Sequence, residues 1–147
     1  MAAKQQKTKI DISDYGLTKD QREKLGELII ERIYERTTVE NKSYTGRSFP
    51  KYSESYKKSL DFKVAGKSAS DINLELSGDM LAALRVLSDS KNQITVGFDA
   101  GTDENARAEG NILGSYGGDP NPKKARDFLG VNSTELRKLV QRVKRDE

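Results

Sequence analysis

The spacing of hydrophobic positions predicts a long amphipathic helix near the start of the chain. Apolar residues recur three and four positions apart, as on one helical face, at Leu25, Leu28, Ile29 and Ile33. Before them, Thr18 and Gln21 have the Ser/Thr-x-x-Glu/Gln form of a capping box, which satisfies free amide groups at a helix start. The pattern therefore predicts a helix from Gln21 to about Thr37.

Acidic residues follow the same predicted helix at a spacing of four. They are Glu23, Glu27, Glu31 and Glu35. Like charges at this spacing repel one another, and opposite charges nearby, such as Lys24 before Glu27, relieve part of the repulsion. The row could face a basic partner, but a solvated outer face on a helix that packs on the core explains it without one.

The middle of the chain alternates between strand and helix patterns. Ile72–Leu76 and Gln93–Phe98 alternate apolar and polar residues, as half-buried strands do. Between them, Ser77-Gly78-Asp79 can cap a helix. The apolar stripe of that helix would be Met80, Leu81, Leu84 and Leu87. A second short helix is predicted from Glu104 to about Leu113.

Two more elements are predicted towards the C-terminus. Arg126–Gly130 can add a short strand, and Asn132 or Ser133 then caps a final helix. The buried face of this helix consists of Leu136, Leu139, Val140 and Val143. Its outer face and last turns carry Arg137, Lys138, Arg142, Lys144 and Arg145. The helix dipole favours cations near a C-terminus, so this charge needs no ligand to explain it.

The length of 147 residues fits one compact domain. The first residues are polar and include Lys4, Lys7 and Lys9, so we expect residues 1–17 to form a flexible N-terminal tail. Residues 18–147 then form a single domain.

A stretch rich in glycine and proline runs from Ala106 to Gly130. It holds five of the twelve glycines and two of the three prolines, and it ends in the apolar pair Phe128-Leu129. These residues predict a long functional loop anchored at both ends. Gly114–Gly118 lacks the Lys-Ser/Thr ending of a phosphate-binding loop and does not fit the dinucleotide fingerprint, so contact with another protein is the favoured use.

Residues 42–67 form a basic segment, with 7 basic and 2 acidic side chains. Half of the ten aromatic residues lie in it: Tyr44, Phe49, Tyr52, Tyr56 and Phe62. Such a segment can bind nucleic acid, because amines neutralise phosphates and rings stack on bases. Alternatively, the rings hold an extended arm on its own core or on a neighbouring subunit. The second interpretation is favoured, since no recognised nucleic-acid motif accompanies the segment.

Composition argues against familiar catalytic chemistry. The chain has no cysteine and no histidine, which removes the usual zinc ligands, disulfides, the thiol nucleophile and the commonest general base. The candidate carboxylates mostly occupy cap or turn positions and have no nucleophile beside them: Asp79, Asp99, Asp103, Glu109 and Asp119. We therefore expect no enzyme, no catalytic residue, no cofactor and no bound metal.

The chain has a net charge of +3, and no apolar run of about 18 residues or signal-peptide pattern is present. We expect a protein that is made and kept in a cytosol, without a membrane partner. Hydrophobic residues make up 34% and charged residues 33%, which favours a small core with extended loops over a large globule.

The order of several short motifs resembles the phage virion morphogenesis, or tail completion, proteins. These typically run through a Gly-Arg-Pro-aromatic segment, a Leu-Thr-Gly helix start, a Tyr-Ala-x-x-His-x-x-Gly segment and an Ala-Arg-Pro-Phe-Leu-Gly ending. The corresponding segments here are Gly46–Tyr52 followed by Ser55-Tyr56, then Leu74–Leu81, Val96-Gly97, Ala106–Gly118 and Ala125–Gly130. The resemblance covers roughly residues 44–145, and it depends on the shared order because no single motif is specific.

The sequence departs from the family pattern at several positions. Ser77 replaces the usual Thr, and Asp127 replaces the Pro of the last motif. In the third segment Ala108 and Gly114 keep the family spacing, whereas Arg107 stands where Tyr would and Asn111 where His would. These differences leave the subfamily open, because head-tail connector and tail-terminator proteins share a similar layout.

The resemblance implies an α+β fold, in which a small antiparallel sheet packs with a long N-terminal helix, a central helix and a C-terminal helix, joined by long loops. It also implies a subunit that forms a ring with copies of itself at the neck or top of a phage tail. The ring would complete the tail, join it to head, connector and other tail proteins, and let genome DNA pass through its lumen without sequence-specific binding. The protein would be assembled in the host cytoplasm and reside in the virion.

We expect the subunit and partner contacts to lie in the basic aromatic arm and in the glycine-rich loop. The candidate contact residues are Tyr44, Arg47, Phe49, Tyr52, Tyr56, Gly114, Tyr116, Gly117, Gly118, Arg126 and Phe128. The alternative function is a basic nucleic-acid-binding accessory protein. It would use Lys51, Lys57, Lys58 and Tyr56.

Overall fold

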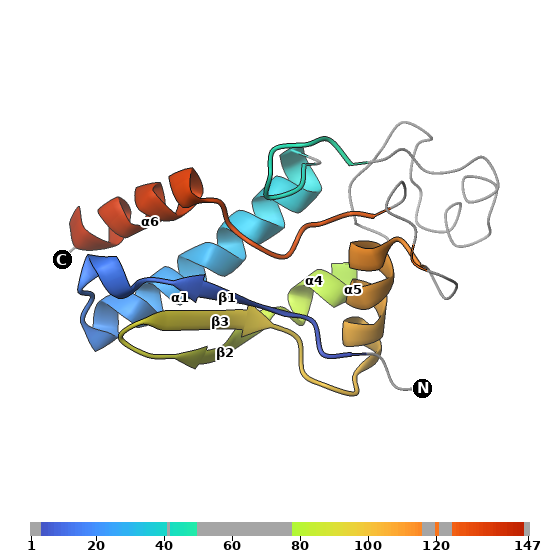
Figure 1. Ribbon diagram of the computed structural model, residues 1–147, viewed down its shortest axis with the longest axis horizontal. Coiled ribbons are helices and arrows are strands. Elements are labelled where there is room, and N and C mark those ends of the chain that lie inside the picture. Colours follow the sequence, from blue (N-terminus) through green and yellow to red (C-terminus); the bar gives the residue numbers. More distant parts are fainter. Residues whose placement is uncertain (1–3, 41, 50–77, 116–119, 121–124, 146–147) are drawn as a thin grey trace.

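The computed structural model describes residues 4–40, 42–49, 78–115, 120 and 125–145. The protein has an α+β fold (Figure 1). Its sheet has three antiparallel strands in the order β1-β3-β2. Helix α1 runs behind the sheet, and α6 packs against α1 (Figure 1). Helices α4 and α5 pack together at the end of the molecule opposite α6 (Figure 1). The predicted fold class is therefore confirmed.

The middle strand of the sheet is β3, Gln93–Gly97, as the alternating pattern predicted. On one side it pairs with β1, Lys7–Asp11, so that Ile10 lies opposite Ile94. On the other side it pairs with β2, Arg85–Asp89, with an irregularity between Val86 and Ser88. Because β3 is flanked on both edges, its residues from Ile94 onward are all buried.

The expectation of a flexible tail over residues 1–17 is wrong for the part that the structure describes. Ile10, Ile12 and Leu17 are buried, and the backbone of Gln6 is bonded at both its amide and its carbonyl. A 3₁₀ turn, Ser13–Tyr15, then leads to α1. Two of the lysines that suggested a tail, Lys7 and Lys9, are exposed residues of the edge strand β1, where charge is expected.

Helix α1, Lys19–Glu35, begins with the predicted capping box. The Thr18 hydroxyl accepts a hydrogen bond from the Gln21 amide at 3.2 Å, and the Gln21 side-chain oxygen accepts one from the Thr18 amide at 2.8 Å. A π-helical turn, Arg36–Glu40, follows directly. The predicted helix thus forms, with its four stripe residues buried.

The predicted central helix is shorter than expected. Helix α4 covers Gly78–Ala82, after which the chain enters β2, so Leu84 and Leu87 do not lie on the helix. Leu84 precedes β2, and Leu87 lies within it at the irregularity, because pairing of this segment with β3 begins at Arg85. The predicted strand Ile72–Leu76 lies outside the described residues.

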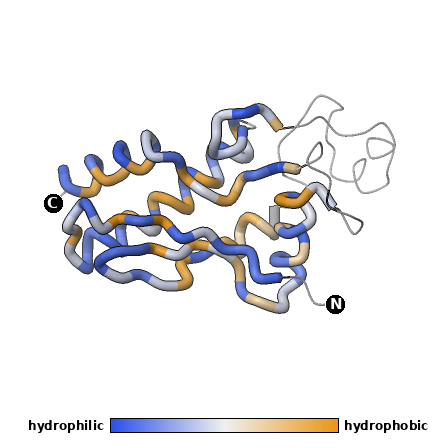
Figure 2. The backbone as a smooth tube through the Cα atoms, in the orientation of Figure 1, coloured by the Kyte–Doolittle hydropathy of each residue, from blue (hydrophilic) through white to orange (hydrophobic). Residues whose placement is uncertain are grey.

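The two C-terminal helices form as predicted, but the strand between them does not. Helix α5 covers Asp103–Leu113, with the Thr102 hydroxyl as its N-cap. Helix α6 covers Ser133–Arg145, and in Figure 2 it is hydrophobic towards the body and hydrophilic outward. Arg126–Gly130 has no strand, since the amides of Phe128 and Gly130 donate to carbonyls only two residues earlier.

The core lies between the sheet, α1 and α6 and extends to the end where α4 and α5 meet. Phe98, which follows β3, meets Phe128 edge to face with ring centres 6.3 Å apart, and both rings are fully buried. This contact joins the sheet to the 126–130 segment. The apolar segments in Figure 2 accordingly turn towards the middle of the molecule.

Gly97 is required by close approach of the neighbouring strand. A Cβ atom at this position would lie 2.4 Å from the Gln6 carbonyl oxygen and 2.7 Å from the Lys7 Cα, which are backbone atoms that cannot move aside alone. We expect Gly97→Ala to lower the free energy of unfolding by about 1–3 kcal/mol through overpacking. Urea denaturation measures this, with the exposed Ser88→Ala as a control, and an unchanged midpoint for Gly97→Ala would contradict it.

Candidate interaction surfaces

A buried arginine joins the end of α1 to the C-terminal part of the chain. The Arg36 side chain is only 3% exposed. Its Nη2 donates to the carbonyl oxygens of Phe128 and Gly130, each at 2.7 Å, and its Nη1 donates to Glu135 Oε1 at 2.8 Å. One guanidinium therefore fixes the 126–130 segment and the first turn of α6 against α1.

Glu135 is the second member of this cluster. It caps α6 reciprocally with Asn132, whose side-chain oxygen accepts the Glu135 amide at 2.8 Å while Glu135 Oε1 accepts the Asn132 amide at 3.1 Å. Its other oxygen accepts from Arg32 Nε at 2.6 Å. Arg32 also pairs with Glu40. The predicted Asn132 cap is confirmed, and it proves to be part of an ion-pair network.

The environment shifts the pKa of Arg32, Arg36 and Glu135. Burial lowers the pKa of Arg36, whereas the hydrogen bond to Glu40 raises the pKa of Arg32. Burial alone would raise the pKa of Glu135, but hydrogen bonds from the Asn132 amide, Arg32 and Arg36 outweigh it and lower the pKa. The carboxylate form of Glu135 is therefore favoured in the folded protein.

The loop over residues 42–49 packs against the same segment. Its turn closes through the Ser43 amide and Arg47 carbonyl at 2.8 Å, with Gly46 at φ 89°. The Tyr44 carbonyl accepts from the Asn132 side chain at 2.9 Å, and its ring lies over Gly130. The neighbouring Asp127 carboxylate, together with burial, raises the pKa of the Tyr44 hydroxyl. Tyr44 is thus engaged with its own chain.

The structure corrects several of the expected contact residues. Phe49, Arg126 and Phe128 are buried within the chain, at 4%, 5% and 0% exposure, so their side chains are not presented on the surface of the subunit. Gly114 is the left-handed C-cap of α5, at φ 69°. Arg47 is exposed. The other expected contact residues lie outside the described residues: Tyr52, Tyr56, Tyr116, Gly117 and Gly118. So do the lysines expected to bind nucleic acid, Lys51, Lys57 and Lys58.

The expected long loop from Ala106 to Gly130 begins as helix, because α5 continues to Leu113. Asn111 on this helix is buried, and its side chain donates to the Arg107 carbonyl at 2.9 Å and lies 3.9 Å from the Met80 sulfur. Its backbone carbonyl accepts from the Arg126 amide at 2.6 Å. Asn111, one of the departures from the family pattern, therefore joins α5 to α4 and to the 126–130 segment.

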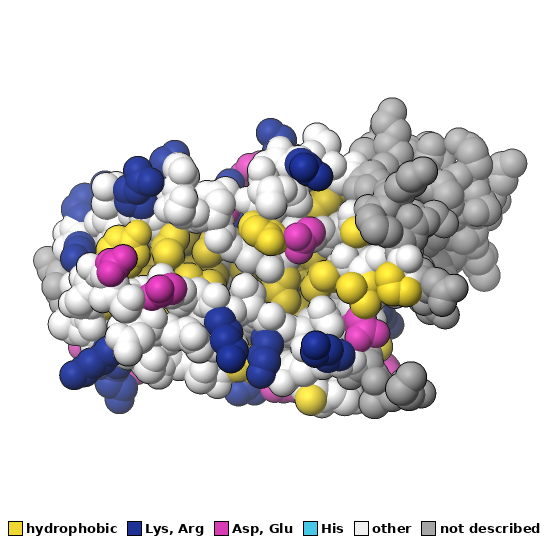
Figure 3. Space-filling model, in the orientation of Figure 1, with side chains coloured by type: hydrophobic (Ala, Val, Ile, Leu, Met, Phe, Trp, Pro, Cys, Tyr) yellow, Lys and Arg dark blue, Asp and Glu magenta, His cyan; other side chains and the backbone are white. Residues whose placement is uncertain are grey.

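Two outward faces of the molecule carry opposite charge. The acidic row of α1 is exposed at all four of its glutamates, and Glu35 lies 3.7 Å from Arg32. The basic residues of α6 are exposed as well, and Lys and Arg side chains gather over this helix in Figure 3. The sequence predicted both faces but gave them no function.

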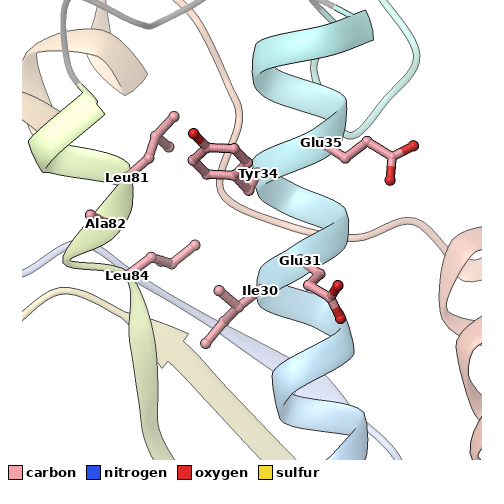
Figure 4. A pocket seen from close by; sticks show the side chains of 7 residues that line it. All are labelled: Ile30, Glu31, Tyr34, Glu35, Leu81, Ala82 and Leu84. Carbon is pink, nitrogen blue, oxygen red and sulfur yellow. The ribbon is translucent and has the colours of Figure 1, made fainter.

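A groove of about 390 Å³ lies between α1 and α4 (Figure 4). Tyr34 and Ile30 of α1 point towards Leu81 and Leu84 on its other side, and Ala82 completes the apolar lining. Glu31 and Glu35 form the rim, on the flank of α1 away from α4 in this view. Tyr34 is 47% exposed although it is large and apolar. Sequence analysis missed this groove, because it depends on how α4 meets α1.

The described residues contain no group of three or more acidic side chains placed to hold a metal ion. Three of the carboxylates considered as catalytic candidates occupy structural positions among the described residues. Glu109 accepts the Lys4 amide at 2.8 Å, Asp103 lies in the first turn of α5, and Asp99 lies 3.4 Å from Arg85. Among the residues that the structure describes, no helix is long and apolar enough to cross a membrane.

No protein family, curated protein or solved structure matches this chain in the comparisons.

Replacing Arg36 tests the buried network. We expect Arg36→Met to lower the free energy of unfolding by about 2–4 kcal/mol, because the bonds to two carbonyls and Glu135 are lost. Arg36→Lys should also destabilise, since an ammonium cannot reproduce the planar fork. Urea denaturation measures both. The control is Arg85→Met, which breaks an ion pair whose side chains are 58% and 56% exposed and should cost less than about 0.5 kcal/mol. Equal effects of the two Met variants would contradict this role for Arg36.

The pKa shift of Glu135 predicts a dependence of stability on pH. The pKa of Glu135 in the folded protein lies below the ordinary glutamate value of 4.5. Its contribution to stability is therefore complete above that value and is lost as the pH falls through the lowered pKa. The Tm of Glu135→Gln should therefore lie below that of wild type at neutral pH, and the difference should narrow as the pH falls below 4.5. Thermal melts across this range, with the exposed Glu23→Gln as a control, measure the difference. A constant difference would contradict the assignment.

Proposed function

We propose that this protein is a structural subunit of a phage virion, which forms a ring at the neck or the top of the tail. There it completes the tail and joins it to the head or connector. The proposal comes from the order of motifs shared with the virion morphogenesis proteins. The observation that carries it furthest is that the described residues of these motifs, far apart in the sequence, meet in one region.

The contacts between the motif segments are specific. Tyr44, just before the first motif, lies over Gly130 of the last, and the Arg126 amide of the last motif binds the Asn111 carbonyl of the third. Asn111 also approaches Met80 of the second motif. These contacts place the segments that carry the resemblance in one part of the fold, and this placement supports considering them together.

In this proposal the mechanism is geometric. Copies of the subunit meet through two different surfaces, and such head-to-tail contacts generate a closed ring when the rotation between neighbours closes. Neck, connector and tail proteins bind the ring on its two ends, and genome DNA passes through the lumen without sequence-specific contacts. The subunit is assembled in the host cytoplasm and becomes part of the virion.

Nucleic-acid binding is the second candidate function, and the described residues offer one observation in its favour. The outer face of α6 exposes five basic side chains along 13 helical residues. A face of this kind can neutralise phosphates, and its affinity for DNA would fall steeply with salt. Cations are also favoured at a helix C-terminus for local reasons, so the structural role remains the preferred proposal.

Immunogold labelling of purified particles, viewed by electron microscopy, separates the two functions. If the proposal is right, gold attaches at the junction of head and tail, because the protein is a fixed component there. Particles prepared without this protein serve as the control for non-specific labelling. Unlabelled particles with the protein free in the lysate would overturn the virion role and favour a nucleic-acid-binding accessory protein.

A further inference from the structure

We infer that the groove between α1 and α4 receives the basic outer face of α6 from a second copy of this chain. This inference rests on the proposed ring, and it names the two surfaces that would meet in it. The groove combines an apolar lining, an exposed tyrosine and an acidic rim. Its occupant must therefore carry both aliphatic length and positive charge.

Arginine and lysine side chains have this combination. Their aliphatic stems cover apolar surface while the charged ends stay at the edge. In the groove, the stems would lie over Ile30 and Leu84, and the charged ends would reach Glu31 and Glu35 on the rim. Tyr34, exposed between the two glutamates in sequence, offers a ring face on which a guanidinium can stack.

The charge spacing on the two helices matches. Glu31 and Glu35 are four residues apart on α1, and Lys138 and Arg142 are four residues apart on α6. Each pair spans about 6 Å along its helix axis, because an α-helix rises 1.5 Å per residue. Two packed helices can therefore bring both pairs of opposite charges together at once.

The partner must be another copy, because the chain's own α6 cannot reach the groove. Leu136, Val140 and Val143 turn the inner face of α6 into the core, so Lys138 and Arg142 face outward. On α1, Arg32 contacts α6 through Glu135, and Tyr34 lies two residues further, on nearly the opposite side of the helix. Groove and basic face thus belong to different sides of one subunit, as a head-to-tail contact requires.

Charge reversal tests the inference in the full-length chain. Glu31→Lys alone, or Lys138→Glu with Arg142→Glu, should weaken self-association about tenfold, measured by analytical ultracentrifugation at low salt. Combining Glu31→Lys with Lys138→Glu should recover most of the loss, because the opposite charges face each other again. Matched controls are Glu23→Lys, two turns away on the same acidic row, and Lys91→Glu in the exposed β2–β3 turn; both should associate as wild type.

Disulfide trapping gives a second measurement that detects weak association. The chain has no cysteine, so Glu31→Cys and Lys138→Cys place a single thiol on each surface. Mixing the two variants under mild oxidation should give a 31–138 cross-linked dimer, and Glu23→Cys mixed with Lys138→Cys should give much less. Circular dichroism melts confirm that each variant is folded.

The outcomes separate this inference from the proposed ring. A 31–138 cross-link no stronger than the Glu23→Cys control, or no recovery in the combined charge variant, would overturn the groove contact. Gold labelling at the head-tail junction in that case leaves the virion role standing with another interface. If the α6 variants instead lose binding to duplex DNA while self-association is unchanged, the basic face binds nucleic acid and the inference is wrong.

Discussion

The hydrogen bonds of the buried Arg36 guanidinium are the interaction on which much of the structure depends. A buried cation is stable only when acceptors replace the water it has lost. Arg36 finds them in two backbone carbonyls and in Glu135, which lies 99 residues away in the sequence. Because Glu135 also caps α6 and binds Arg32, the end of α1, the 126–130 segment and the start of α6 are positioned by one shared set of contacts.

This arrangement explains how the 126–130 segment is held without belonging to the sheet. The amides of Phe128 and Gly130 donate to nearby carbonyls of the same segment, and their own carbonyls accept from Arg36. Buried backbone groups need partners of some kind, and here a side chain takes the place of a neighbouring strand. The Phe128 ring can then fill the core against Phe98 while its backbone remains irregular.

Sequence reasoning succeeded where the determining contacts are local. The α1 cap at Thr18 and the α6 cap at Asn132 each depend on a residue three positions away, so the sequence displays them directly. It failed for β1, where Thr8, Ile10 and Ile12 alternate with charged residues as in a strand. The lysines of this segment favoured a solvated tail, and the pairing with β3 that makes it a strand involves residues far away in the sequence. It also failed for Leu84 and Leu87, because the helix ends at Ala82 and the chain pairs with β3 from Arg85 onward. The ion-pair network of Arg36 and Glu135 and the groove at Tyr34 are formed by segments far apart in the sequence, so no local sequence pattern predicts them.

The burial of the motif residues changes where partner contacts are expected. Phe49 and Phe128 belong to segments that carry the family resemblance, and both fill the interior of their own chain. Residues of this kind specify how a subunit folds, and they leave recognition to side chains that remain outside. The acidic row of α1 lies before residue 44, where the resemblance begins. The basic residues of α6 lie within the resemblance, but the helix dipole alone also accounts for cations near a helix C-terminus. Partner contacts of this chain are therefore expected on its exposed helix surfaces rather than at the buried residues of the motif segments.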